Sequence, residues 1–172
     1  MKSFILRNRH AFLAAIALYQ LLGGILGIGI LWYIYGLEGI LATFLVSFFL
    51  LGLLLLLIYS GICYFRPSKR HRFFMLSIIM LLLQVFQFRF PGFAFHLYYS
   101  PYIAIGINGD LEFLFQLKLI TYQVGLWLSR EGDFPFRFMI SFFPVILLLI
   151  LDLIRTAKPV DALEGFAEQQ PG

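Results

Sequence analysis

The residue types that could carry chemistry are sparse in this chain. Its three histidines and single cysteine, His10, His71, His96 and Cys63, lie far apart along the sequence. A zinc or iron–sulfur site built by one chain needs several such ligands at close spacing, and a lone cysteine excludes an intrachain disulfide. We therefore expect no metal, no cofactor and no catalytic residue, and an enzyme is the weaker interpretation.

Two further patterns resemble functional motifs only superficially. Asp110 and Glu112 share a strand face next to the predicted hairpin turn and would be compatible with a cation, but a turn acceptor beside a solvated charge is the more ordinary interpretation. The glycines at 23 and 24 lie in an apolar segment without the lysine of a phosphate-binding loop. Neither pattern predicts a site.

Polar residues inside apolar segments are the better candidates. Gln84 and Gln87 are one helical turn apart and are followed by Arg89, and Asp152 interrupts the last apolar segment. Polar groups at such positions usually form hydrogen bonds between neighbouring helices. The alternative is an intramembrane polar patch that lines a cavity.

The composition indicates an integral membrane protein. The chain has 172 residues, of which 61% are hydrophobic and 13% are charged. A soluble domain carries about 25% charged residues, and disordered chains have low hydrophobicity. Soluble, disordered and nucleic-acid-binding classes are therefore excluded, and the lipid bilayer is the expected partner.

Four segments are candidates for transmembrane helices, since a span needs about 20 mainly apolar residues. We expect helices at about 11–35, 40–65 and 73–88 within residues 1–88, a tight turn at 36–39, an outer β-rich insertion at 89–135, a fourth helix at 136–156 and a flexible cytoplasmic tail at 157–172. The predicted fold is a membrane all-α bundle of four transmembrane helices. A small antiparallel β insertion lies between helices 3 and 4 on the outer side.

The basic residues predict the orientation. Nine of the 13 lysines and arginines fall at the amino terminus, in the loop at 66–72 and after the fourth span. Short basic loops stay in the cytoplasm, so both termini are expected to be cytoplasmic in a plasma or inner membrane. The residues Arg66, Lys69, Arg70 and Arg72 either only set this topology or also contact anionic lipid headgroups.

Small residues recur on the first span. Ala15, Gly23 and Gly27 share one helix face at intervals of four or eight residues. Such a row lets helix backbones approach closely. We expect packing against the second span, with contact to a second copy or a partner as the alternative.

The outer insertion contains a hairpin signal. Alternating isoleucines at 103, 105 and 107 precede Asn108-Gly109, and a second alternating run follows from Leu111. This pattern predicts a tight turn with Gly109 at positive φ. A slip of the alternation at 119–120 predicts a bulge, and residues 130–133 are expected to form a closing turn. The alternative is an interfacial helix over 110–129.

These features predict a non-enzymatic interaction or accessory subunit that docks through an aromatic outer sheet. Its partner would be another membrane protein or a second copy of the chain. The alternative is a small transporter or oligomeric pore, which requires Gln20, Gln84, Gln87 and Asp152 to face one cavity.

Overall fold

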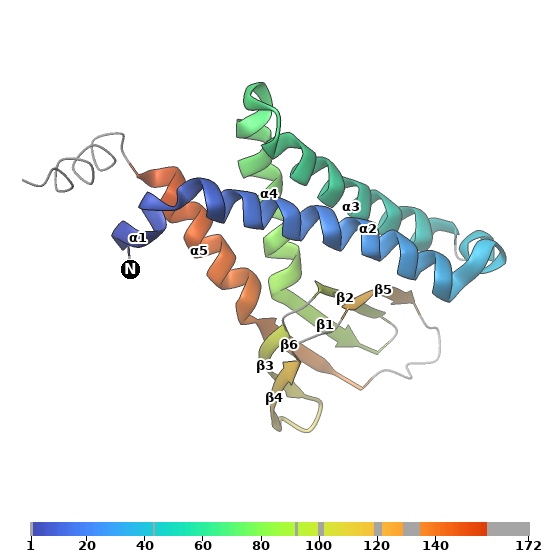
Figure 1. Ribbon diagram of the computed structural model, residues 1–172. Helices are drawn as coiled ribbons and strands as arrows, with labels where there is room; N and C mark the ends of the chain where they lie inside the picture. Colours follow the sequence, from blue (N-terminus) through green and yellow to red (C-terminus); the bar gives the residue numbers. More distant parts are fainter. Residues whose placement is uncertain are drawn as a thin grey trace, which may run out of the picture.

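The computed structural model describes residues 2–42, 44–91, 93–99, 102–118, 122–128 and 135–157. Its elements follow in the order α1 (Lys2–Arg7), α2 (Arg9–Ala42), α3 (Phe44–Tyr64), a short 3₁₀ turn η1 (Pro67–Lys69), α4 (Arg70–Val85), β1 (Phe86–Phe90), β2 (Phe93–Tyr99), β3 (Tyr102–Asn108), β4 (Phe113–Lys118), β5 (Tyr122–Leu128), β6 (Arg137–Ser141) and α5 (Phe142–Thr156). α2 and α3 form a long hairpin that crosses α4 and α5 (Figure 1). The sheet lies at the C-terminal end of α4 and the N-terminal end of α5, away from α1.

Glycines allow α2 and α3 to pack closely. A Cβ atom at Gly24 would lie 2.5 Å from Ile58 Cγ1, and one at Gly61 would lie 2.8 Å from the carbonyl oxygen of Ala17. The Tyr64 hydroxyl donates to the carbonyl of His10 at 3.1 Å, which joins the start of α2 to the end of α3. The turn expected at 36–39 is wrong, because α2 continues to Ala42.

The helical hairpin packs on one part of the sheet. Leu50, Leu54 and Leu57 of α3 form a buried cluster with Phe95 and Leu97 of β2. A second buried cluster joins α2, α3, α4 and α5 and contains Ile16, Ala17, Cys63, Phe73, Leu81 and Leu151. These two clusters position the sheet against the helices.

The sheet is continuous with two helices. β1 follows α4 directly, and β6 runs directly into α5. The described strands form one antiparallel six-stranded sheet in the order β4-β3-β6-β1-β2-β5. β1 and β6 pair with each other, so residues about 50 positions apart in the sequence form its centre, as in the pair Phe86 and Ile140.

The expected bundle of four transmembrane helices is wrong. Among the described residues, two helical segments are long and apolar enough to cross a membrane, Arg9–Tyr33 and Leu45–Tyr64, by length and composition alone. α4 and α5 have 16 and 15 residues. At the rise of an α-helix they span only about 22–24 Å. They are short because residues expected to end or begin these helices pair instead as β1 and β6.

The hairpin predicted at Asn108 is confirmed, since β3 and β4 pair with Ile107 opposite Phe113. The alternative helix over 110–129 is wrong, because Phe113–Lys118 and Tyr122–Leu128 are strands. The predicted bulge at 119–120 and the closing turn at 130–133 lie outside the described residues.

The geometry of the hairpin turn differs from the prediction. The backbone φ of Gly109 is not in the left-handed region, whereas that of Leu111 is +60°. Asn108 organises a three-residue loop, because its Oδ1 accepts hydrogen bonds from the backbone N–H groups of Asp110 and Glu112 at 3.1 and 2.9 Å. Three-residue hairpins place their left-handed residue last, which moves the strained position from Gly109 to Leu111.

Candidate apolar pocket and sheet surface

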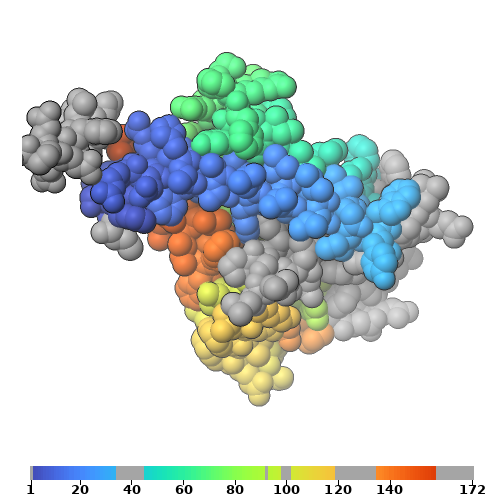
Figure 2. Space-filling model, in the orientation of Figure 1, coloured from blue at the N-terminus to red at the C-terminus, as the bar shows by residue number. Residues whose placement is uncertain are grey.

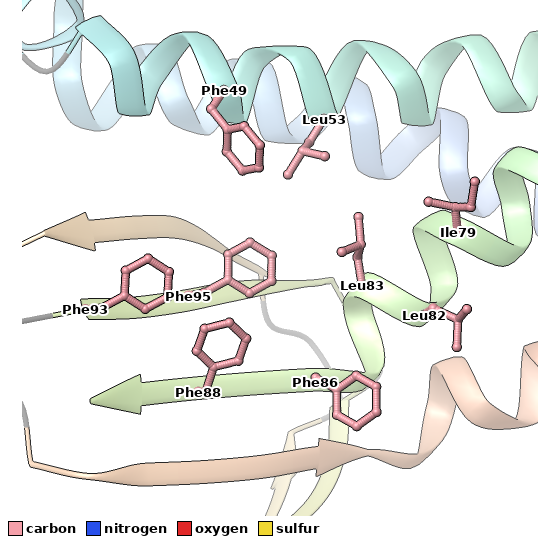
Figure 3. A pocket seen from close by; sticks show the side chains of 9 residues that line it. All are labelled: Phe49, Leu53, Ile79, Leu82, Leu83, Phe86, Phe88, Phe93 and Phe95. Carbon is pink, nitrogen blue, oxygen red and sulfur yellow. The ribbon is translucent and has the colours of Figure 1, made fainter. Parts of the chain in front are cut away.

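An apolar pocket lies where α3, α4 and the sheet meet (Figure 3). Its volume is about 660 Å³. Phe49 and Leu53 of α3 form one wall, and Ile79, Leu82 and Leu83 of α4 form another. α3 and α4 meet at η1 and diverge toward the sheet, so the pocket occupies the open end of a V.

Four phenylalanines of β1 and β2 complete the pocket. They are Phe86, Phe88, Phe93 and Phe95. The rings of Phe88 and Phe93 stack with centroids 5.5 Å apart, and the Phe88 and Phe95 centroids are also 5.5 Å apart. Every lining side chain is a hydrocarbon, so the pocket offers no side-chain hydrogen bond to a ligand. This pocket was not predicted from the sequence, although the alternating phenylalanines at 86, 88 and 90 are typical of a strand such as β1.

The strand register sorts the sheet into an apolar and a polar face. Phe88 lies opposite Phe95 and Phe138, and Ile107 lies opposite Phe113 and Phe138, so these side chains share one face. The apolar face also includes Phe86, Phe90, Ile105, Phe115, Leu117 and Ile140. Phe113 and Phe115 of β4 are 69% and 62% exposed.

Several polar residues of the other face are buried. Gln87 and Tyr102 are 3% and 1% exposed, and the Tyr102 hydroxyl donates to Gln87 Oε1 at 2.8 Å. His96 on the same face is also buried. Burial, and then the positive charges of Arg89 and Arg137, lower the pKa of His96 to about 4. Around β3 and β4, where Tyr102 is buried and Phe113, Phe115 and Leu117 are exposed, the pattern is the reverse of that on a solvated antiparallel sheet.

The structure does not bring the four residues of the predicted polar patch together. Gln84 accepts a hydrogen bond from the Tyr19 hydroxyl of α2 at 2.9 Å, and Gln87 is bonded to Tyr102. Arg89 lies on β1 opposite Ala94 and Arg137. Asp152 is exposed and lies ten residues along α5 from its first residue. That separation is about 15 Å at the rise of an α-helix.

Other buried polar side chains also join helices. Ser77 Oγ of α4 donates to Gln20 Oε1 of α2 at 3.1 Å and lies 3.2 Å from Ser60 Oγ of α3. Hydrogen bonds of this kind hold apolar helices in register.

The predicted helix-packing row is only partly buried. Gly23 and Gly27 are buried, whereas Ala15 is exposed. Gly24 and Gly61, which lie at close contacts between α2 and α3, were not part of the predicted row. The adjacent small residues at 60 and 61 were the available signal on α3.

The basic residues predicted to contact lipid surround the junction of α3 and α4. Arg66, Arg70 and Arg72 are exposed, and Lys69 is half-buried. Arg72 Nη1 donates to the Tyr59 hydroxyl at 3.3 Å, and Lys69 Nζ lies 5.6 Å from the centroid of the Tyr59 ring. Tyr59 therefore holds two cationic side chains at the apex of the V.

The titratable groups of the described residues form no recognisable metal site. Among the residues that the structure describes, no three His, Cys, Asp or Glu side chains are grouped closely enough to bind a metal ion. Glu112 Oε2 accepts from Asn108 Nδ2 at 2.9 Å, so it takes part in the turn.

No family model matches the chain, and no curated protein or solved structure matches it. The site geometry is therefore the basis for a functional argument.

Proposed function

We propose that this chain is a non-enzymatic membrane protein that works as an accessory subunit and docks through strand β4. α2 and α3 cross a plasma or inner membrane, and the apolar face of the sheet contacts its hydrocarbon. The observation that carries the proposal is the exposed aromatic face of an edge strand, Phe113, Phe115 and Leu117.

Two features of β4 favour a partner: its backbone edge away from β3 and its exposed apolar face. Among the described strands, only β3 pairs with β4, so no described strand occupies its other backbone edge. Figure 2 shows β3 and β4, in yellow, projecting from the molecule away from α2. An exposed apolar edge strand tends to associate in water, and a free edge is costly in hydrocarbon. A second membrane protein that pairs an apolar strand with β4 would cover its exposed side chains and provide hydrogen-bond partners for its backbone edge.

The alternative of a transporter or pore has less support. It needs polar groups that face one cavity, whereas Gln84 and Gln87 bond to Tyr19 and Tyr102. We therefore retain the accessory subunit as the proposal.

Two neighbouring substitutions test the docking surface. Phe115 and Gln116 point to opposite faces of β4, so Phe115→Lys and Gln116→Lys place the same charge on the two faces. After crosslinking in native membranes and purification in mild detergent, Phe115→Lys is expected to lose the crosslinked species and Gln116→Lys to retain it. A crosslinked species of two copies would identify the partner as this chain itself. Crosslinking unaffected by Phe115→Lys would refute docking through β4.

A further inference from the structure

We propose that the V between α3 and α4 binds one anionic phospholipid, with an acyl chain in the pocket and the phosphate at Lys69 and Arg72. This inference rests on the membrane insertion proposed above and adds a ligand to it. It does not depend on docking through β4.

The pocket suits a hydrocarbon chain. Its volume of about 660 Å³ lies within the range of small-ligand sites. Water has no side-chain hydrogen-bond partner there, and apolar cavities stay dry. An empty pocket would leave the rings of Phe88 and Phe93 without contacts on one side, and an acyl chain restores those contacts.

An exposed stripe on α4 connects the pocket to the basic residues. Arg72, Met75, Ile79 and Leu82 are all exposed and follow one another at intervals of three or four residues. Side chains at this spacing lie on one face of a helix. Ile79 and Leu82 line the pocket, and Arg72 lies in the first turn of α4, next to η1 at the apex of the V.

The length of this stripe matches one lipid leaflet. Arg72 and Leu82 are separated by about 15 Å at the helical rise. Half of a hydrocarbon core of about 30 Å is about 15 Å. A phosphate held by Arg72 therefore places its acyl chain at the depth of the pocket.

The charge at the apex suits a phosphate. Lys69 and Arg72 are held together by Tyr59, and the sequence contains no acidic residue between Glu38 and Asp110. Neighbouring side chains of α3 and α4 therefore do not neutralise these cations. Each lysine or arginine near a membrane surface contributes about 1 kcal/mol to anionic-lipid binding, which is about fivefold in affinity.

Native mass spectrometry of the full chain in mild detergent tests the site. We expect one dioleoyl phosphatidylglycerol per chain, with dioleoyl phosphatidylcholine bound at least fivefold more weakly. Lys69→Gln and Arg72→Gln should each weaken phosphatidylglycerol binding about fivefold. Leu83→Trp fills the pocket and should weaken it at least tenfold.

Matched variants make the result specific. Arg7→Gln and Arg155→Gln remove exposed arginines from α1 and α5, and Leu149→Trp enlarges an exposed α5 residue outside the pocket. All three should bind phosphatidylglycerol as the original chain does. Ile79→Trp repeats the pocket test if Leu83→Trp fails to fold.

Several outcomes overturn the proposal. Equal binding of glycerol phosphate would assign the site to a free anion, and equal binding of phosphatidylcholine would remove the role of charge. If Leu83→Trp and Ile79→Trp both bind phosphatidylglycerol as the original chain does, the acyl chain does not occupy the pocket. If lipid binding fails while the protein still requires detergent and Phe115→Lys still loses its partner, this inference alone fails. Recovery of the chain in the detergent-free soluble fraction would refute membrane insertion and this inference together.

Discussion

Leu111 occupies the left-handed backbone conformation, which is unfavourable for residues other than glycine. It has φ +60° and is 79% exposed, so no packing compensates for the strain. A left-handed conformation costs a non-glycine residue roughly 1–2 kcal/mol, part of which glycine loses again through its freedom in the unfolded chain. We expect Leu111→Gly to raise the free energy of unfolding by about 0.5–1 kcal/mol and Leu111→Val to lower it. Thermal unfolding in detergent measures both.

Gly109 supplies the control for that prediction. An added Cβ there would meet its nearest neighbour, Phe136, at 3.7 Å, which is an ordinary contact. Gly109→Ala should therefore change stability little. A larger loss for Gly109→Ala than for Leu111→Val would contradict the three-residue turn.

His96 predicts a pH dependence of stability. Its pKa is lowered to about 4 by burial and by Arg89 and Arg137. In the unfolded chain this histidine is protonated below about pH 6.5, whereas in the folded chain it is protonated only below about pH 4. The contribution of neutral His96 to the free energy of unfolding is therefore fully present above about pH 6.5 and is lost as the pH falls toward about 4. The loss is on the order of 2 kcal/mol after allowance for partial solvent screening.

Thermal unfolding between pH 7 and pH 4 measures this loss. His96→Gln should flatten the pH profile, whereas His71→Gln, at an exposed position on α4, should leave it unchanged. A profile that His96→Gln does not alter would assign the acid sensitivity to other groups.

At the scale of elements, the α2–α3 contact depends on Gly24. Its added Cβ would lie 2.8 Å from the backbone oxygen of Leu54 as well as close to Ile58. Gly24→Ala should therefore lower the free energy of unfolding by about 1–3 kcal/mol, as other overpacked contacts do. Gly29 on the same helix has open space around its Cβ position. Gly29→Ala should be neutral or stabilise the helix by up to about 1 kcal/mol.

Calorimetry or thermal unfolding of both alanine variants in detergent tests the helix contact. Equal stability of the two proteins would mean that the hairpin does not pack as closely as the glycines indicate.

At the scale of the whole molecule, two spans predict opposite exposure of the two ends of the α2–α3 hairpin. Position 43 lies between α2 and α3, and Ser68 lies in the basic turn between α3 and α4. In a Cys63→Ala background, we expect Thr43→Cys to react with an impermeant reagent from outside and Ser68→Cys from the cytoplasmic side. Labelling of both from one side would contradict the proposed crossing.

The sequence determined several features because the information is local. The alternation on both sides of Asn108 is enough to predict the β3–β4 hairpin, since hairpin strands meet across a short loop. The apolar length of Arg9–Tyr33 and Leu45–Tyr64 is likewise a property of continuous segments. The turn residue at positive φ was misassigned because a two-residue and a three-residue loop share the same Asn-Gly dipeptide.

Only the tertiary structure decided the rest, because it depends on contacts between distant segments. Phe86–Phe90 is apolar enough to extend a helix, and it becomes a strand through its pairing with Arg137–Ser141. That pairing shortens α4 and α5 and aligns the phenylalanines into one face. The pocket then forms where this face meets α3, because Phe49 and Leu53 come from a different part of the chain than the rest of its lining, which lies within residues 79–95.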